Sequence, residues 1–515
     1  MARCRWRMLI QDTEREPAAA VPAALGQFFS ARETPAFLVG GYVRDLLLSV
    51  GSWHDVDIAV QGDAGQVAQD LASSLGGVCV PLSPRHGISR VVVARPPQDG
   101  QTSDEAPSGD LIIDIVGYLG SIEEELARRD FTIDALALPL GDGSGPVSID
   151  QVIDPFNGRE DLTRKCIRAL GPGVFRDDPG RLLRGVRLAA QLKFRLDPET
   201  AALMSAEAPR ISQVSGDRLR DEFLLLLSLD GARGHLQVLD RLDLLCRVIP
   251  ELTATKGVEQ PRVHYWDVWD HVIHSVEYAE LVTKGHQNSP VYSLAPWTEE
   301  TEQYFSQQVS DGHTRRTLLK LAALLHDIAK PQTKNTDETG RTRFLGHSEL
   351  GATMADARLR QLRLSSRGIS MVTTMVAQHL RPTNMSQGDQ LPSNRAIYRY
   401  FRDLDDVAID TLYLCLADYL AAKGPDLSLD DWVAHTQMIS YILQTGTQQT
   451  VVQKSERLVT GHDLMDHFHL SPGPIVGELL DRIGEARAAG EITTREEALA
   501  EAAEALAGPS LEGRE

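Results

Sequence analysis

The chain has 515 residues, of which 42% are hydrophobic and 24% charged, and its formal net charge is −20. At about 100–200 residues per domain, the length predicts about three or four domains, and the composition excludes a disordered or fibrous chain. No apolar run approaches the ~20 residues of a membrane span, and the N-terminus lacks the apolar core of a secretory signal. Five widely spaced cysteines exclude a disulfide scaffold and a cysteine-type zinc finger. We therefore expect a reduced, soluble, cytoplasmic protein.

The negative charge argues against a protein whose whole surface is basic and binds nucleic acid. A local basic groove is compatible with it, because arginine and lysine slightly outnumber the acidic residues between 159 and 247. After residue 481 the charged residues are mostly glutamate. This segregation of charge along the chain predicts a basic site on an acidic body.

From residue 36 to about 157, short apolar runs alternate with helical periods. A polar loop at 96–109 interrupts the pattern, and Ser121 with Glu124 forms the capping box that starts a helix. We expect a small mixed sheet with helices. The expected strands are 36–39, 56–60, 78–80, 90–94, 111–116, 134–138 and 147–153, and the expected helices are 43–50, 64–75 and 121–127.

After residue 158 strands disappear from the pattern and helical periods dominate. A polar stretch at 284–312 interrupts a long helical block and is interpreted as an inserted loop. The fold class predicted is α+β, with a mixed-sheet head followed by all-α parts. The expected domains are 20–157 (head), 158–255 (helical neck and body), 256–445 (second helical domain) and 446–508 (helical tail).

The sharpest local pattern is a Gly-Gly turn followed by two aspartates on one strand. Asp55 and Asp57 share a face because side chains alternate along a strand. Two adjacent carboxylates repel each other unless a cation lies between them, and oxygen ligands suit Mg²⁺. Gly40 and Gly41 allow backbone N–H groups to approach a phosphate, and Arg44 can meet another phosphate oxygen. Together these residues predict a two-metal phosphoryl- or nucleotidyl-transfer site.

Asp114 is the candidate for a third carboxylate. It lies inside an apolar strand, where an acid is costly unless it is paired or bound to a metal. Asp110 is the rival, but its place at the start of the strand favours a turn role. We therefore expect Asp55, Asp57 and Asp114 to form the catalytic group.

These residues stand in a set of motifs that resembles the class II tRNA nucleotidyltransferase and bacterial poly(A) polymerase family, which has a DNA polymerase β-type head. The resemblance spans about 38–225. The segments that carry it are 38–45, 55–57, 128–135, 154–162, 175–184 and 216–222.

The resemblance implies roles for further residues. Arg128 and Asp130 would hold the ribose and triphosphate of the nucleotide. Asp178 and Arg181 would read the Watson–Crick edge of CTP or ATP, since arginine only donates and an aspartate only accepts hydrogen bonds. As an alternative, Asp178 before Pro179 is a good helix N-cap.

Two more arginines, Arg184 and Arg187, follow Arg181 on one helix face. Such a face is usually solvated, but here its edge is expected to meet nucleotide or tRNA phosphate. The sequence departs from the family pattern at Asp134, where asparagine is common, and at Asp177-Asp178, where Glu-Asp is common.

The segment after Asp114 is short, because Ile115–Gly120 runs almost directly into the next helix. In the resembling family a longer flexible loop there helps to switch the site to ATP. A shortened loop is a feature of members that add only two cytidines. We treat this as a hint towards CC addition.

The second constellation is a set of histidines and aspartates on helical segments, in the order H…HD…H…H…D, which resembles the HD phosphohydrolase family. Imidazole and carboxylate ligands suit a transition metal, and adjacent His and Asp can reach one centre or bridge two. Hydrolysis of phosphate ends and a metal-stabilised tRNA platform are both open roles for this domain. The residues are His271, His326, Asp327, His347, His379 and Asp418.

The function predicted is template-independent addition of CMP, AMP or both to the tRNA 3′ end, with Mg²⁺ as cofactor and a transition metal expected in the HD domain. The expected partners are tRNA, CTP and ATP, with no membrane. A poly(A) polymerase and an A-adding enzyme share the same head and stay open. An alternative of another class is an HD phosphohydrolase whose head only binds nucleotide or RNA. The sequence leaves the oligomeric state open.

Overall fold

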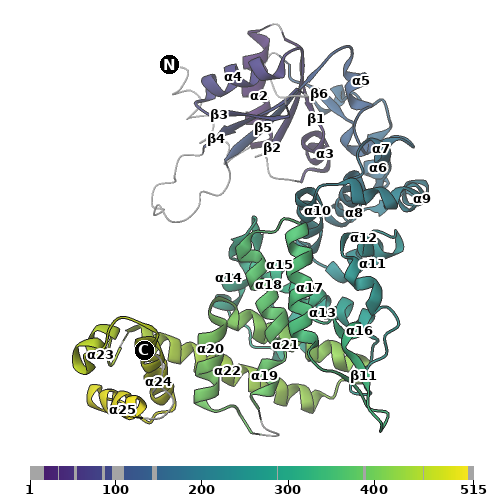
Figure 1. The fold of residues 1–515 in the computed structure, drawn as a ribbon. Coiled ribbons are helices and arrows are strands. Elements are labelled where there is room, and N and C mark those ends of the chain that lie inside the picture. Colours follow the sequence, from purple (N-terminus) through teal and green to yellow (C-terminus); the bar gives the residue numbers. More distant parts are fainter. Residues whose placement is uncertain are drawn as a thin grey trace. The chain divides into compact units, whose positions relative to one another are not determined.

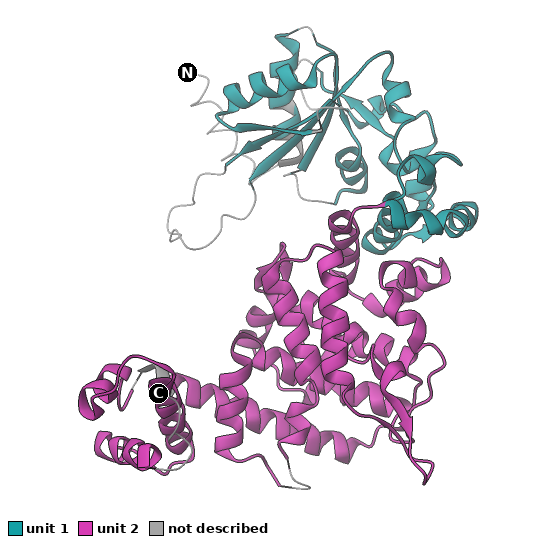
Figure 2. Cartoon of the chain, viewed as in Figure 1, with its two compact units in different colours: residues 1–213 teal, residues 214–515 magenta. Residues whose placement is uncertain are grey.

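The structure is a computed structural model, and it describes residues 17–32, 34–50, 55–83, 87–94, 110–141, 148–286, 288–386, 390–455 and 457–507. The chain divides into two compact units, residues 1–213 and 214–515 (Figure 2). The first unit contains a six-stranded sheet, and helices dominate the second (Figure 1). This is the predicted α+β class.

The sheet of the first unit is mixed, as predicted. Its strand order is β3-β4-β5-β2-β1-β6. Only β2 and β5 run parallel, and every other neighbouring pair is antiparallel. The strands are β1 (Ala36–Val39), β2 (Asp55–Gln61), β3 (Val78–Ser83), β4 (Ile88–Val93), β5 (Leu111–Tyr118) and β6 (Ala137–Pro139).

Alternation along the strands gives this sheet one apolar and one partly polar face. Ile58, Val91 and Ile113 are fully buried on the face that α4 (Ala64–Leu75) covers. The capping box at Ser121 forms as predicted and starts α5 (Ile122–Leu126), which packs on the other face beside the C-terminal half of β2. The N-terminal half of β2 therefore keeps an accessible face.

The first unit continues through short helices and turns. These elements are α2 (Pro17–Ser30), α3 (Gly41–Leu48), η2 (Thr132–Asp134), η3 (Ile149–Gln151), α6 (Gly158–Thr163), α7 (Val174–Asp177), α8 (Arg181–Leu192), α9 (Pro198–Glu207) and η4 (Ala208–Gln213). The polar loop at 96–109 lies outside the described residues.

Two strand predictions in this unit are wrong. In the segment 147–153, residues 149–151 form a 3-10 turn, and Ile153 makes only an isolated bridge to Ala137. Strands also do not end at residue 158, because β7 (Cys166–Ile167) and β8 (Arg195–Leu196) pair in parallel. Two-residue strands are too short to produce a detectable period in the sequence.

The second unit is a helical array with two short hairpins. Its helices are α10 (Gly216–Ser228), α11 (Ala232–Arg241), α12 (Leu245–Val248), η5 (Pro250–Thr255), α13 (Val268–Val282), η6 (Tyr292–Leu294), α14 (Glu299–Ser306), α15 (Arg315–Leu325), α16 (Lys330–Thr333), α17 (His347–Gln361), α18 (Ser366–Gln378), α19 (Arg381–Asn384), α20 (Asn394–Leu404), η7 (Asp405–Val407), α21 (Ala408–Lys423), η8 (Gly424–Asp426), α22 (Leu429–Ser455), α23 (Gly461–Phe468), α24 (Pro474–Ala488) and α25 (Arg495–Ala507). The hairpins are β9 (Gln308–Ser310) with β10 (His313–Thr314), and β11 (Lys334–Thr336) with β12 (Thr342–Phe344). None of the helices in the described ranges is both long and apolar enough to cross a membrane.

The stretch 284–312 is not a simple inserted loop, because it contains α14. Thr298 caps this helix by accepting a hydrogen bond from the N–H of Thr301. Glu299, Glu300 and Glu302 lie in its first turn, where negative charge favours a helix. The polar composition that suggested a loop is therefore that of a capped helix.

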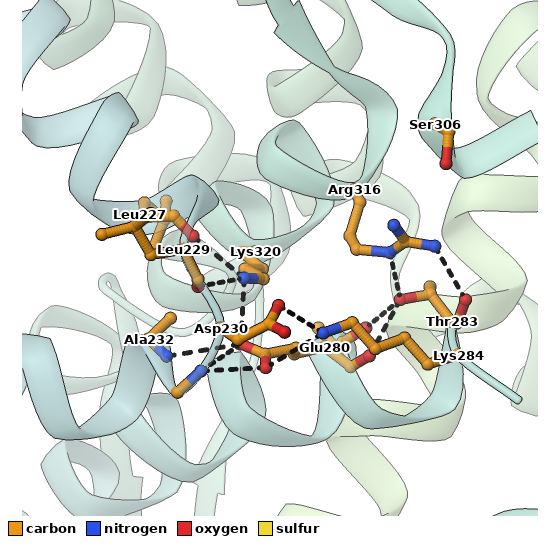
Figure 3. Close-up of polar contacts among 12 residues, drawn as sticks. Leu227, Leu229, Asp230, Ala232, Glu280, Thr283, Lys284, Ser306, Arg316 and Lys320 are labelled. Carbon is orange, nitrogen blue, oxygen red and sulfur yellow. Dashed lines mark hydrogen bonds and ion pairs between the residues drawn. The ribbon is translucent and has the colours of Figure 1, made fainter. Parts of the chain in front are cut away.

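Lys320 on α15 is buried at a junction of helices in this unit (Figure 3). Its Nζ donates to the carbonyl oxygens of Leu227 and Leu229 at 3.0 and 2.9 Å. It also lies 2.9 Å from Oε2 of Glu280 on α13. Glu280 accepts a hydrogen bond from the N–H of Ala232 in the first turn of α11. One buried ion pair thus joins the end of α10 to α11, α13 and α15.

Candidate functional site

The two aspartates of β2 lie as the sequence predicts, on the accessible face of the sheet. Val56 between them is buried, whereas Asp55 is exposed and Asp57 partly exposed. The parallel pairing of β2 with β5 places Asp57 opposite Asp114. The three predicted carboxylates therefore belong to two neighbouring strands, as a shared cation site requires.

Asp114 is held by an arginine that the sequence analysis did not single out. Arg90 on β4 lies in register with Asp114 and donates from Nε to Oδ1 at 2.7 Å and from Nη2 to Oδ2 at 2.8 Å. Alternation within 88–93 places Arg90 on the partly exposed face. The sequence shows on which face of the strand Arg90 lies, but it does not show the strand register that pairs Arg90 with Asp114.

Gly40 lies where the backbone approaches Asp57. Its φ is +69°, and a Cβ added there would lie 2.6 Å from Nη1 of Arg129 and 3.0 Å from Oδ2 of Asp57. Burial raises the pKa of Asp57 to about 6, with Asp114 adding to this rise and Arg129 opposing it. Arg129, which is part of the Arg-Arg-Asp motif, therefore belongs to the site, and Gly40 leaves the space that its guanidinium fills.

Arg44 lies in a buried network below the site. Its Nη1 donates to Oδ1 of Asp134 and its Nε to Oδ1 of Asp45, both at 2.7 Å. Arg184 donates from Nε to Asp130 at 2.7 Å and from Nη2 to Asp134 at 3.4 Å. Burial would raise the pKa of Asp134, but the two arginines hold it below its ordinary value. Arg44 and Arg184 thus link α3 and α8 to the η2 turn.

A cavity of about 330 Å³ opens beside these carboxylates. Its wall contains charges of both signs, which suits a ligand with phosphate groups and a bound cation. Five predicted site residues, Asp57, Asp114, Arg128, Asp130 and Arg181, line it. The other lining residues are Val39, Ile58, Ile88, Val116, Glu125 and Arg129.

The predicted nucleotide-reading residues follow α7 and begin α8. Oδ1 of Asp178 accepts a hydrogen bond from the N–H of Gly180 at 3.0 Å, and Gly180, not Asp178, is the N-cap of α8. Arg181 donates from Nη2 to the carbonyl oxygen of Arg128 at 2.8 Å, which ties α8 to the cavity wall. Arg187 bonds Gln191 on the same helix at 2.7 Å and is not among the residues that line the cavity.

The second unit brings together all six residues of the HD pattern. Nε2 of His271 lies 3.0 Å from Oδ1 of Asp418 and 3.2 Å from Nε2 of His326. Nε2 of His347 lies 3.4 Å from Nε2 of His379 and 3.4 Å from Oδ1 of Asp327. Five segments therefore supply one polar cluster: α13, the end of α15, the first residue of α17, the end of α18, and α21.

Backbone carbonyl groups orient three of these imidazoles. Nδ1 of His326 donates to Ala323 at 2.8 Å, Nδ1 of His347 to Phe344 at 2.6 Å, and Nδ1 of His379 to Val376 at 2.7 Å. This hydrogen bond places a proton on Nδ1 and turns Nε2 towards the cluster. Metal-binding histidines in proteins are usually held in this way.

Asp327 supplies the test of whether the cluster fits a cation. Its side chain is 1% exposed, and its Oδ2 lies 2.6 Å from Nζ of Lys330 and 3.2 Å from Nε2 of both His271 and His326. Burial would raise its pKa, but His326 and Lys330 hold it well below the ordinary value. A buried ionised carboxylate among imidazole nitrogens fits a divalent metal. Two groups could each hold one ion, with His326 common to both: His271, His326 and Asp418, and His326, Asp327 and His379.

Comparison with family models assigns the parts of the chain. Residues 36–168 match the poly A polymerase head domain, and residues 268–423 match the HD domain. Between them, residues 193–256 match the model described as the probable RNA and SrmB-binding site of polymerase A. The first match contains the carboxylates and the second contains the histidine cluster.

Two relatives match this chain over most of their length. A protein from Deinococcus radiodurans named A-adding tRNA nucleotidyltransferase is 32% identical over 473 residues, which cover 90% of this chain and 94% of that protein. A protein from Thermus thermophilus named CC-adding tRNA nucleotidyltransferase is 31% identical over 473 residues, covering 90% of this chain and 92% of that protein.

Solved structures show the same fold at lower identity. A Thermotoga maritima CCA-adding enzyme complexed with tRNA has a TM-score of 0.59 and 21% identity, covering 94% of this chain and 95% of that one. A CCA-adding enzyme in complex with CTP has a TM-score of 0.60 and 20% identity, with 95% of each chain covered. The motifs, the head domain and the full-length relatives lead to one conclusion: the chain belongs to the tRNA nucleotidyltransferase family.

Proposed function

We propose that this enzyme transfers CMP from CTP to the 3′ end of tRNA without a nucleic-acid template. The observation that carries the proposal is the cavity in the head, where Asp57 and Asp114 meet Arg128, Asp130 and Arg181. The names of the full-length relatives supply the acceptor, since both are tRNA nucleotidyltransferases.

Asp55, Asp57 and Asp114 would hold the Mg²⁺ ions. When bound, Mg²⁺ lowers the pKa of an attacking hydroxyl and neutralises charge on the leaving pyrophosphate. Neighbouring residues of the head hold Asp57 in place. Gly40 allows the backbone to pass close to Asp57, and Arg129 lies against both residues. The attacking group in this proposal is the 3′-hydroxyl of tRNA.

Arg128, Asp130, Asp178 and Arg181 would bind the nucleotide. Arg128 and Asp130 lie on the cavity wall where a triphosphate and a ribose are expected. Arg181 offers donors and Asp178 acceptors to the edge of the base, which needs both. The buried pairing of Arg44 and Arg184 with carboxylates supports a positioning role for these two arginines.

Only three residues separate β5, which ends at Tyr118, from α5, which begins at Ile122. Since the long flexible loop associated with ATP selection is missing there, we propose that the enzyme adds two cytidines and stops. A-addition is the second candidate, because the relative at 32% identity carries that name.

The deciding experiment extends three tRNA transcripts, which end before the CCA, after the first C and after CC. Each is incubated with labelled CTP or ATP, and the products are resolved to single nucleotides. Arrest after CC with no AMP added supports the proposal. Addition of one AMP to the CC transcript alone supports A-addition, whereas unlimited extension with ATP alone indicates a poly(A) polymerase.

Paired substitutions separate the two sites. Asp55→Ala with Asp57→Ala is expected to abolish nucleotide addition, and His326→Ala with Asp327→Ala is expected to leave it intact. If addition survives the first pair, the head is not the catalyst and the HD centre becomes the candidate.

For the HD centre we propose a bound transition metal, with hydrolysis of a phosphate end as the reaction it would serve. The buried carboxylate of Asp327 and the oriented imidazoles support metal binding. Metal analysis of the purified protein, followed by assays with 2′,3′-cyclic phosphate and 3′-phosphate RNA ends, tests both steps. A metal-loaded protein without hydrolysis would favour a structural platform for tRNA.

We further propose a cytoplasmic location, where tRNA and nucleoside triphosphates are available. All four cysteines in the described part of the chain are free thiols, as expected in a reducing compartment. The tail, residues 446–508, would contact tRNA, and cross-linking of full-length protein to tRNA tests this.

A further inference from the structure

Arg90 lies among the carboxylates of the head, and the roles proposed above leave it unassigned. Arg90, Asp114 and Asp57 form a row across three adjacent strands. Arg90 on β4 pairs in register with Asp114 on β5, and Asp114 pairs with Asp57 on β2. The row faces the side of the sheet where Asp57 and Asp114 line the cavity. Arg90 is thus adjacent to the proposed cation site.

The contact between Arg90 and Asp114 fixes the carboxylate in two ways. The guanidinium donates to both oxygens, at 2.7 and 2.8 Å. Such a two-pronged contact sets the position and also the rotation of the carboxylate plane. The side chains are 37% and 27% exposed, so the pair lies at the surface of the site.

Arg90 also lies near the carboxylates of β2. The register places Arg90, Asp114 and Asp57 side by side on one face of three adjacent strands. The same proximity means that Arg90 adds positive potential where a cation would bind. A like charge at short range weakens cation binding.

We infer that Arg90 is a positioning residue for nucleotidyl transfer, which fixes Asp114 beside Asp55 and Asp57 and lowers the affinity of these carboxylates for a divalent cation. The inference rests on the proposed function. It assigns two effects of opposite sign to one side chain: faster chemistry through Asp114 and weaker cation binding through charge. A side chain that only supported the fold would not produce this combination.

The test compares Mn²⁺ binding to the full-length protein, measured from the electron paramagnetic resonance signal of free Mn²⁺, with the Mg²⁺ dependence of CMP addition. Arg90→Gln removes both the charge and the two-pronged contact. Its dissociation constant for Mn²⁺ is expected to fall about 3- to 10-fold, while kcat at saturating Mg²⁺ falls about 10- to 100-fold. Arg90→Lys keeps the charge without the planar fork, so Mn²⁺ binding stays unchanged and kcat falls.

Two controls assign the effect to the head. In a background with Asp55→Asn and Asp57→Asn, Arg90→Gln is expected to leave Mn²⁺ binding unchanged, which separates this site from the histidine cluster. Arg32→Gln breaks a 2.7 Å ion pair with Asp70 of α4, on the covered side of the same sheet, and is expected to leave both readouts unchanged. Thermal melting confirms that each variant is folded.

Unchanged or weaker Mn²⁺ binding by Arg90→Gln overturns the electrostatic part of the inference, and an unchanged kcat overturns the positioning part. If the wild-type protein transfers no nucleotide, the proposed function fails and the positioning role fails with it. The Mn²⁺ comparison is independent of that result, so the two failures are distinguishable.

Discussion

Gly40 is a residue of the carboxylate site whose replacement is expected to impair both stability and activity. Its positive φ strains any other residue, and an added Cβ would lie 2.6 Å from Arg129. Gly40→Ala is therefore expected to cost about 1–2 kcal/mol of stability and to lower kcat, because Arg129 must move away from Asp57. Denaturant unfolding and single-turnover extension of tRNA measure the two effects.

Gly76 provides the matched control. It has nearly the same φ, +72°, but no atom lies within 4 Å of an added Cβ. Gly76 has ψ 25° and Gly40 has ψ −140°, which is the less accessible conformation for alanine, so Gly76→Ala is expected to destabilise the protein less and to retain full activity per folded molecule. Equal loss of kcat in both variants would show that strain, and not the displacement of Arg129, causes the Gly40 effect.

Asp57 is expected to destabilise the protein at neutral pH when no metal is bound. Burial raises its folded-state pKa to about 6 from the ordinary 3.8. Because the folded state favours the proton, this cost is absent below about pH 4 and complete above about pH 6. In chelator, Asp57→Asn is expected to stabilise the protein by about 1–3 kcal/mol at neutral pH, with a gain that disappears towards pH 4. Thermal melts across this range test the prediction, and a gain independent of pH would contradict it.

Individual residues could be predicted from the sequence where their chemistry allows few roles. Alternation alone placed Asp55 and Asp57 on one face, and the apolar strand around Asp114 marked it as paired or metal-bound. The ion pair of Arg44 with Asp134 was not predicted, because the two residues are 90 positions apart in the chain. Arg90 went unnoticed for a similar reason, since its contact depends on strand register, which distant pairing decides.

Helix α15 depends on the buried Lys320, which satisfies Glu280 and two carbonyl groups. Lys320→Met would leave Glu280 charged and buried without this partner. Glu280 keeps Lys284 at 3.4 Å and the N–H groups of Gly231 and Ala232, so the expected loss is about 3 kcal/mol of unfolding free energy. Denaturant unfolding of the full-length protein, followed by circular dichroism, measures it.

Arg247→Met is the control for this loss. Its partner, Asp243, lies 2.5 Å away on the protein surface, and removing such a pair is expected to cost less than about 1 kcal/mol. Adding Glu280→Gln to Lys320→Met is expected to recover part of the stability. No recovery would mean that the lost carbonyl contacts, and not the unpaired carboxylate, explain the cost.

Whole helices could be predicted where the helical periodicity extends over several turns. The helix at 64–75 has the predicted bounds. The segment 147–153 was wrong because its apolar residues pack beside the sheet through one bridge and not through a ladder. Helix α14 was missed because its acidic first turn resembles a loop when read only for polarity.

For the molecule as a whole, the two sites should respond differently to metal removal. A chelator is expected to extract a tightly bound metal from the histidine cluster and to lower the melting temperature of the helical unit by roughly 5 °C or more. Subsequent addition of Mg²⁺ alone is expected to restore nucleotide addition. Calorimetry measures the melting temperature, metal analysis measures the bound metal, and the tRNA extension assay measures nucleotide addition.

Asp327→Asn is the reference for that experiment. The variant is expected to be purified with less metal, to show no further loss of melting temperature in chelator, and to extend tRNA normally. Impaired extension by this variant at saturating Mg²⁺ would contradict the independence of the two sites.

The residues that line the head cavity lie between 39 and 181, and the six residues of the histidine cluster lie between 271 and 418. The two sets have no residue in common, so a substitution in one set leaves every residue of the other in place. A lineage that no longer needs the second chemistry can lose its histidines one by one without any compensating change among the carboxylates. A relative that retains the carboxylates of the head can therefore lack the histidine cluster, and both sets of residues must be checked in each relative.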